Sequence, residues 1–222
     1  MIRLTQHHIK LAHYLLEGDE EGAMQYIEEQ FQKYPRLYVY EDVITPAMYY
    51  VGELWEKNEI SVADEHLATA ICDFVVSKLE AKLPSIKGNR QKEFKVLLFG
   101  VEEEQHYIGL KMVAETFKEE GWRVRYLGPN LNVEHSLNQV RRFKPHVIGL
   151  SAALSYRLPT LKKLVKEFRT LEWKPLIMIG GRMARKFELE ELETDQVMVV
   201  KDLNNLHQWF KEGRAGIINE TS

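Results

Sequence analysis

His106 is the side chain in this 222-residue sequence whose position best suits metal chemistry. It lies in a short acidic loop after an apolar, strand-like run at residues 94–101, and Gly109 follows three residues later. An imidazole nitrogen is a good ligand for a transition metal, and a nearby carboxylate can accept the hydrogen of the other ring nitrogen. Glu104, two residues before His106, is placed to do this. The pattern predicts a histidine ligand that a carboxylate orients.

Ser151 and the pair Gly180 and Gly181 follow two other apolar runs. A serine hydroxyl can donate or accept a hydrogen bond, and a glycine has no Cβ, so a bulky ligand can approach its backbone closely. Taken singly, a loop histidine is more often a surface residue, and a Gly-Gly pair after a strand is more often a turn. Their predicted meeting at one edge of a sheet favours a shared binding site.

Five short apolar runs after residue 92 alternate with amphipathic helical stretches. This alternation predicts a parallel sheet with helices on both faces, and we expect the flavodoxin-like strand order 2-1-3-4-5 over residues 93–215. In that order the first, third and fourth strands are neighbours, so His106, Ser151 and Gly180 meet in one crevice. The predicted strands are residues 94–101, 122–127, 146–151, 175–179 and 197–200.

The N-terminal part of the chain, residues 1–83, has helical periodicity throughout. Four helices with short connections predict an antiparallel bundle. Residues 84–92 contain Pro, Gly and several cationic or amide side chains but little to bury, so we interpret them as a linker. The chain is therefore expected to contain a helical domain, a linker and an α/β domain.

The expected helices of the bundle have recognisable ends. The first should end near Gly18, because glycine is the usual residue after a helix C-terminus. The third should run over about residues 37–55, with Pro46 bending it. Ser61 and Asp64 have the spacing of a capping box at the start of the fourth, which should continue to about residue 83.

A second set of side chains is expected at one end of this bundle. Trp55 closes the third helix, a short turn reverses the chain, and Glu65 and His66 lie in the first turns of the fourth. All three can then face one ligand. The alternative is that Trp55 continues a core stripe and that Glu65 and His66 are solvated first-turn residues. A carboxylate at the edge of an apolar helix face favours a polar ligand.

Composition narrows the function classes. The formal net charge is −3, with 45% hydrophobic and 28% charged residues, so there is no basic footprint for direct nucleic-acid binding. The single cysteine, Cys72, excludes an internal disulfide and a multi-thiolate metal site, and its apolar neighbours predict a core position. No signal peptide or membrane-spanning run is evident, so we expect a cytoplasmic protein.

The loops of this chain do not fit two other classes of protein with the flavodoxin-like fold. A phosphoacceptor receiver domain needs an aspartate after the third strand, where this chain has Ser151. A flavodoxin needs a phosphate loop after the first strand, but residues 102–104 are three glutamates, which would repel a phosphate.

The motifs at the strand ends resemble those of cobalamin-binding domains of the methionine synthase type. Glu104, His106 and Gly109 are similar to the Asp-x-His-x-x-Gly motif of that family, and Ser151 and the Gly-Gly pair are similar to its other two motifs. The resemblance implies that His106 is the lower cobalt ligand in place of the cofactor's benzimidazole, whose tail lies beside the serine and glycines. Glu104 replaces the usual Asp, and Ala153 stands where Leu is usual.

The bundle resembles that of light-dependent cobalamin regulators of the CarH type. Trp55 followed after nine residues by Glu65 and His66 is similar to the motif that covers the upper face of adenosylcobalamin in that class. The resemblance implies that the Trp packs on the adenosyl group and that the Glu and His lie close to it. Some of these sensors have a second histidine directly after the Trp, where this chain has Glu56.

These resemblances predict a non-enzymatic adenosylcobalamin sensor that responds to light. Such regulators usually carry an N-terminal DNA reader, but here Met1 leads directly into the first predicted helix. We therefore expect no direct nucleic-acid contact, and output through self-association or a protein partner. The main alternative is a corrinoid protein that carries a methyl group for a methyltransferase system and binds methylcobalamin. A third possibility is a cobalamin store, or a domain that has lost its cofactor.

Overall fold

The computed structural model describes residues 6–82, 94–187, 189–214 and 216–217. The chain divides into two compact units, residues 1–84 and residues 85–222, which are described separately below. The predicted linker at 84–92 and the predicted domain limits at 83, 93 and 215 lie outside the described residues. Among the described residues, no helix is long and apolar enough to cross a membrane.

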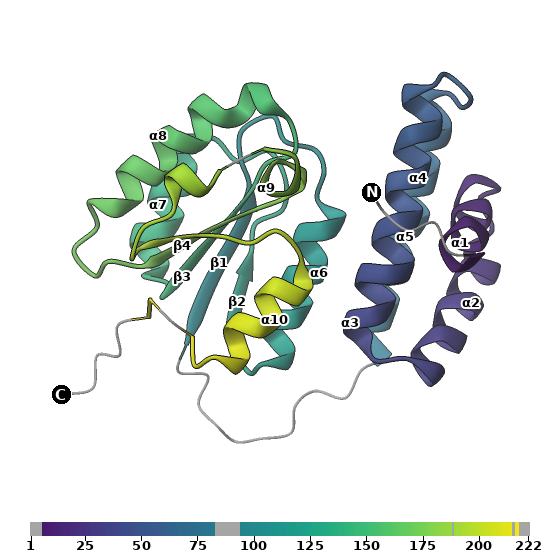
Figure 1. The fold of residues 1–222 in the computed structure, drawn as a ribbon, viewed down its shortest axis with the longest axis horizontal. Coiled ribbons are helices and arrows are strands. Elements are labelled where there is room, and N and C mark those ends of the chain that lie inside the picture. Colours follow the sequence, from purple (N-terminus) through teal and green to yellow (C-terminus); the bar gives the residue numbers. More distant parts are fainter. Residues whose placement is uncertain (1–5, 83–93, 188, 215, 218–222) are drawn as a thin grey trace. The chain divides into compact units, whose positions relative to one another are not determined.

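The first unit is the predicted helical bundle, in which α1 packs against α2, α4 and α5 (Figure 1). Its core contains Cys72, which is 2% exposed, as predicted. Gly18 follows the first helix with a φ of 71°, and Ser61 and Asp64 exchange the hydrogen bonds of a capping box. The elements are α1 (Gln6–Leu16), α2 (Glu20–Lys33), α3 (Arg36–Tyr38), η1 (Val39–Ile44), α4 (Thr45–Glu56) and α5 (Val62–Lys82).

The third predicted helix is not a continuous α-helix bent at Pro46. A π-helical segment, η1, separates the short α3 from α4, and Pro46 lies in the first turn of α4. Proline has no N–H to donate and its ring crowds the carbonyl four residues earlier, so the wider hydrogen-bonding pattern just before it is a physical alternative to a kink. Trp55 does not continue a core stripe of this helix, because Val51 is buried whereas Trp55 is 47% exposed.

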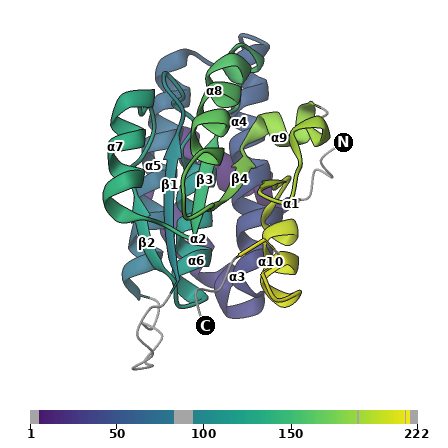
Figure 2. The same ribbon diagram turned by 90° about the vertical axis from the view of Figure 1, so that its left-hand side faces the viewer.

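The second unit is the predicted five-stranded parallel sheet with the order β2-β1-β3-β4-β5, which confirms the flavodoxin-like topology (Figure 2). Helices α7 and α8 cover one face, and α6 and α10 cover the other. The strands are β1 (Lys95–Gly100), β2 (Arg123–Tyr126), β3 (Val147–Ser151), β4 (Leu176–Gly180) and β5 (Val197–Val199). The helical elements are α6 (Ile108–Glu119), α7 (Val133–Phe143), η2 (Ser155–Arg157), α8 (Leu158–Arg169), α9 (Arg182–Lys186), η3 (Glu190–Leu192) and α10 (Leu203–Lys211).

The two faces of the sheet have different cores. Under α7 and α8 the core is mainly aliphatic and includes Leu97, Ile148 and Leu164. On the other face, Phe117 of α6 packs edge-on against Trp122 and Phe210, with ring centroids 5.1 Å apart in both pairs. Burial on both faces explains why the central strands are almost continuously apolar. This rigid sheet positions the loops at its carboxyl edge.

Candidate functional site

The carboxyl ends of β1, β3 and β4 lie side by side, as predicted. Gly100 pairs with Ser151, and Ser151 pairs with Gly180, so the last residues of the three strands are in register. Ser151 is 4% exposed and lies between two glycines. The loop after β1 carries Glu104 and His106 to this same edge, since His106 lies two residues before α6.

Glu104 and His106 form the predicted carboxylate–histidine pair. Glu104 Oε1 lies 2.6 Å from His106 Nδ1 and accepts a hydrogen bond from the His106 backbone N–H at 2.8 Å. Glu104 is fully buried, whereas the His106 side chain is 40% exposed. A neutral imidazole that donates from Nδ1 has an unprotonated Nε2, which is the form that binds a metal.

The second carboxylate oxygen of Glu104 reaches a different loop. Glu104 Oε2 accepts a hydrogen bond of 2.5 Å from the backbone N–H of Ala153, two residues after the end of β3. The two departures from the family motif, Glu104 and Ala153, meet in this contact. The longer Glu reaches the imidazole and the third-strand loop together, and the contact at Ala153 is made by the backbone rather than by the side chain.

The charge state of Glu104 follows from these bonds. Burial raises the pKa of its carboxyl, but the hydrogen bonds from His106 and from the Ala153 N–H favour the carboxylate and outweigh burial, so the pKa lies below its usual value. A buried carboxylate that remains ionised is a strong acceptor for the imidazole N–H. It therefore fixes both the tautomer and the orientation of His106.

The three site glycines have different roles. Gly181 has a φ of 93°, and a Cβ there would lie 2.4 Å from the Ala152 carbonyl oxygen, so the fold itself requires glycine. At Gly109 a Cβ would meet nothing within 4 Å, and at Gly180 its nearest neighbour would be the Val200 carbonyl oxygen at 3.7 Å. Packing among the described residues does not require glycine at these two positions, and both leave the backbone accessible to a bulky ligand.

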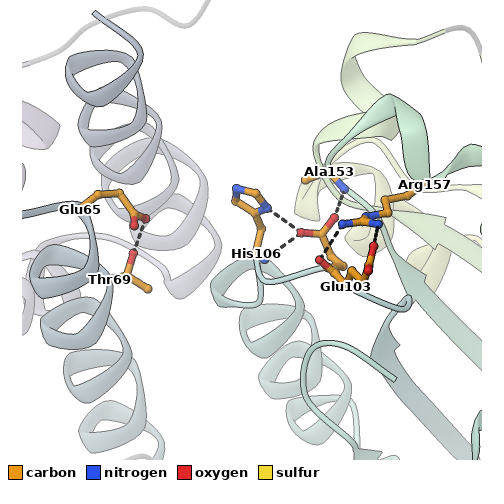
Figure 3. A network of polar contacts seen from close by, with 7 residues as sticks. Glu65, Thr69, Glu103, His106, Ala153 and Arg157 are labelled. Atoms are coloured by element: carbon orange, nitrogen blue, oxygen red, sulfur yellow. Dashed lines mark hydrogen bonds and ion pairs between the residues drawn. The ribbon is translucent and has the colours of Figure 1, made fainter. Parts of the chain in front are cut away.

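The predicted residues of the bundle lie at one end of the first unit. Trp55 is in the last turn of α4, and Glu65 and His66 are in the first turns of α5. His66 Nδ1 lies 2.7 Å from Glu65 Oε2. The Thr69 hydroxyl donates to Glu65 Oε1 at 2.9 Å (Figure 3). The exposure of Trp55 shows that it is not a core residue of the bundle. His66 is 74% exposed, which fits a solvated side chain as well as one that faces a ligand.

Sequence reasoning missed several contributors to these contacts. Thr69 is four residues after Glu65, and the helical i, i+4 rule could have found it. Arg157 and Asn130 contact the loop that carries Glu104, but each is more than 20 residues away along the chain, on a loop after another strand. The sequence offered no comparable signal for them.

The residues present fit a corrinoid cofactor of the kind that the sequence motifs predict. A single exposed histidine, held by a buried carboxylate, suits a metal that brings its other ligands with it. The open space at Gly109 suits a large group lying against the backbone, and Gly180 has no side chain to obstruct one. The residues that would hold such a group in this unit are His106, Ser151, Gly109, Gly180 and Gly181.

Comparisons with known proteins identify both units. Residues 9–80 and residues 94–202 each match a protein family described as a B12 binding domain. The chain is 26% identical over 171 residues to the HTH-type transcriptional repressor CarH of Myxococcus xanthus, which covers 77% of this chain and 56% of CarH. It thus spans little more than half of that relative's length.

Corrinoid proteins are matched over more of their length. Dimethylamine corrinoid protein 1 of Methanosarcina mazei is 21% identical over 189 residues, which are 84% of this chain and 87% of that protein. The structure of the Methanosarcina barkeri monomethylamine corrinoid protein superimposes with a TM-score of 0.68 at 17% identity, covering 91% of this chain and 96% of that one. At this identity the structural likeness shows the fold alone.

Proposed function

The chain is a pair of B12-binding domains, a helical cap followed by a Rossmann-like domain, and from this premise we propose that His106 ligates the cobalt of its cobalamin. The observation that carries the proposal is the bond between His106 Nδ1 and the buried Glu104 carboxylate, which leaves Nε2 free. Bound cobalamin would supply a cobalt–carbon bond that light can break in the adenosyl form and that can be used for methyl transfer in the methyl form.

The ligation is tested by electron paramagnetic resonance of the protein loaded with cob(II)alamin. If His106 binds cobalt, labelling the protein's histidines with ¹⁵N should change the nitrogen splitting from a triplet to a doublet, because the nuclear spin changes. His106→Ala should abolish this isotope effect, and His135→Ala, which changes an exposed histidine on α7, should keep it. A splitting that ignores the label in the unsubstituted protein would mean that the cofactor's own base remains bound.

The first candidate use of the cofactor is methyl carriage between methyltransferases. The relatives matched over most of their own length are corrinoid proteins, and this supports the carrier better than it supports the light sensor that sequence reasoning ranked first. In this role the chain is a component of an enzyme system and not itself the catalyst. Its residues hold the corrinoid through His106 and leave the methyl group accessible to partner proteins.

The second candidate is the adenosylcobalamin light sensor, a regulatory protein rather than an enzyme. A specific observation favours it, namely the exposed indole of Trp55 at the same end of the cap as the linked Glu65 and His66. In this proposal the indole packs on the adenosyl group and the two polar side chains contact it. Light would then change self-association or the binding of a protein partner.

The two uses make opposite predictions about Trp55. A sensor should bind adenosylcobalamin in preference to methylcobalamin in the dark, and Trp55→Ala should abolish that preference. A carrier should prefer methylcobalamin and respond little to Trp55→Ala. Val62→Ala is the matched control, because Val62 is an exposed apolar residue, 53% accessible, at the start of α5. Spectra and elution volumes measured before and after illumination then show whether light changes the assembly.

A further inference from the structure

The loop at residues 101–107, between β1 and α6, is tied to the loops on both sides of it. We propose that Arg157 and Asn130 are positioning residues that together form a brace holding the Glu104–His106 pair ready for cobalt ligation. The inference rests on the proposed function in so far as His106 is the ligand. The brace itself is a property of the protein without cofactor.

Arg157 supplies one side of the brace from η2, after β3. Its guanidinium forms an ion pair with the Glu103 carboxylate through Nη1, and Nη2 donates to the Glu103 carbonyl oxygen at 3.2 Å (Figure 3). The guanidinium also lies 4.4 Å from the centre of the Tyr156 ring. The Arg157 side chain is 15% exposed, but that of Glu103 is 69% exposed, so solvent screens the ion pair in part and the hydrogen bond to the Glu103 carbonyl oxygen supplements it.

Asn130 supplies the other side from the loop after β2. Its Oδ1 accepts a hydrogen bond of 2.7 Å from the Glu103 N–H, and its own N–H donates to the Glu104 carbonyl oxygen at 3.0 Å. Asn130 has a φ of 55°, a left-handed conformation that asparagine adopts more readily than most residues. The backbone of two consecutive loop residues is thereby fixed by one side chain and one peptide group.

The brace acts at a residue with an unfavourable backbone. Glu103 has a φ of 62°, which is uncommon for a residue with a Cβ and is maintained only when surrounding contacts impose it. This turn directly precedes Glu104, whose side chain is fully buried beneath His106. If the brace is removed, Glu103 can sample an ordinary φ, and the backbone that carries Glu104 is then held less firmly.

The effect of losing the brace should be partial. Glu104 keeps its own hydrogen bonds to His106 and to the Ala153 N–H when Arg157 is replaced. Arg157 contacts Glu103, so it acts on His106 through the loop backbone and Glu104. Replacing it should increase the mobility of His106 and reduce the fraction of cobalt bound by histidine, without unfolding the sheet.

The experiment compares Arg157→Met, which keeps the apolar stem, with Asn130→Gly, which keeps the left-handed backbone but removes the side-chain acceptor. Lys162→Met is the matched control. Lys162 forms an exposed ion pair with Glu191, with 3.1 Å between Nζ and Oε1, and neither residue belongs to the loop at 101–107. Amide hydrogen exchange is followed residue by residue without cofactor, and the ¹⁵N-histidine splitting of cob(II)alamin is followed with it.

In Arg157→Met, exchange at residues 103–107 should rise about tenfold, as expected for losing a hydrogen bond to a charged group, while Lys162→Met stays like the unsubstituted protein. In Asn130→Gly, the increase should be largest at the Glu103 amide, whose acceptor is removed. Both variants should show a smaller histidine-ligated fraction. Adding Glu103→Asn to Arg157→Met should restore part of that fraction, because asparagine tolerates the left-handed turn.

Two results would overturn the brace. One is equal loop exchange in Arg157→Met and Lys162→Met, and the other is faster exchange with an unchanged histidine-ligated fraction. Failure of the proposed function looks different. In that case the unsubstituted protein shows no isotope effect on the cobalt splitting at all, whatever the exchange measurements give.

Discussion

Each domain of this chain contains a histidine whose Nδ1 lies against a carboxylate, and the two pairs are built differently. Glu65 and His66 are 2.7 Å apart, and Glu104 and His106 are 2.6 Å apart. On the cap, the Glu65 side chain is bonded to His66 and Thr69 of the same helix, α5, and is 27% exposed. On the sheet, Glu104 is fully buried and is bound by groups from two different loops.

The difference shows how position in the fold changes the use of the same chemistry. A buried carboxylate with several donors fixes its histidine before any ligand arrives, which suits a permanent metal ligand. A pair on one helix surface costs little to rearrange, which suits contact with a group that is exchanged or released. Substitutions that remove one carboxylate–histidine pair and leave the other intact can test this contrast between a prearranged and an adaptable pair.

The largest effect should come from the sheet edge itself. Gly181→Ala places a methyl group 2.4 Å from the Ala152 carbonyl oxygen and puts a Cβ on a residue with φ of 93°, so we expect a loss of about 3 kcal/mol or more in unfolding free energy. Gly180→Ala is the control, because its Cβ would meet only ordinary contacts and should cost less than about 1 kcal/mol. Urea unfolding of both variants without cofactor measures the difference, and equal losses would show that the edge is more compliant than described.

The next largest effect is the difference in stability loss between removing the carboxylate of Glu104 and removing that of Glu65. Glu104→Ala leaves the buried Ala153 N–H without its acceptor, so we expect a loss of about 1–3 kcal/mol. Glu65→Ala removes partly exposed contacts on one helix and should cost about 0.5 kcal/mol. Chemical denaturation followed by circular dichroism provides the measurement. The contrast between the pairs fails if Glu65→Ala is as destabilising as Glu104→Ala.

The pH dependence of stability should show how much the capping box at Ser61 and Asp64 stabilises the start of α5, the helix that carries Glu65 and His66. Hydrogen bonds from the Ser61 hydroxyl and backbone N–H lower the pKa of Asp64 below its ordinary value of 3.8. The capping contribution is therefore complete above 3.8 and is lost as the pH falls through the lower pKa of the folded state. Asp64→Asn should remove this pH dependence from the thermal unfolding curve. A variant that keeps the full acid dependence would assign it to other groups.

The smallest effect is expected at Thr69. Thr69→Val keeps the shape of the side chain but removes the hydroxyl that donates to Glu65, and the stability change should be within about 0.5 kcal/mol. The expected change is instead in selectivity between adenosyl- and methylcobalamin, measured by competition in the dark. Thr160→Val, on α8 of the other domain, is the control. No shift in selectivity would remove Thr69 from the cap site.

Sequence reasoning located the parts of the site that depend on strand ends. His106, Ser151 and Gly180 could be found because parallel strands bring their carboxyl ends together, and the strand pattern was readable from apolar runs. The Glu104–His106 contact followed from their separation by one residue.

Contacts between remote loops could not be found in the same way. Arg157 and Asn130 act through hydrogen bonds whose partners depend on loop conformation, which periodicity does not encode. The choice between a ligand-facing and a core position for Trp55 stayed open for a related reason. A helical stripe predicts which residues share a face, but not where along the helix that face leaves the core.

In the cap, the number of residues in the π-helical segment Val39–Ile44 determines the rotation of α4 about its own axis. A wide turn accommodates one more residue than an α-helical turn, and each residue advances a helix by about 100°. Deleting a single residue there would let the segment become regular and would rotate α4 by about that angle relative to what precedes it. Trp55 would then point elsewhere with no change to its own surroundings in sequence. The direction in which the Trp55 indole points therefore depends on the number of residues in a segment more than ten positions before it.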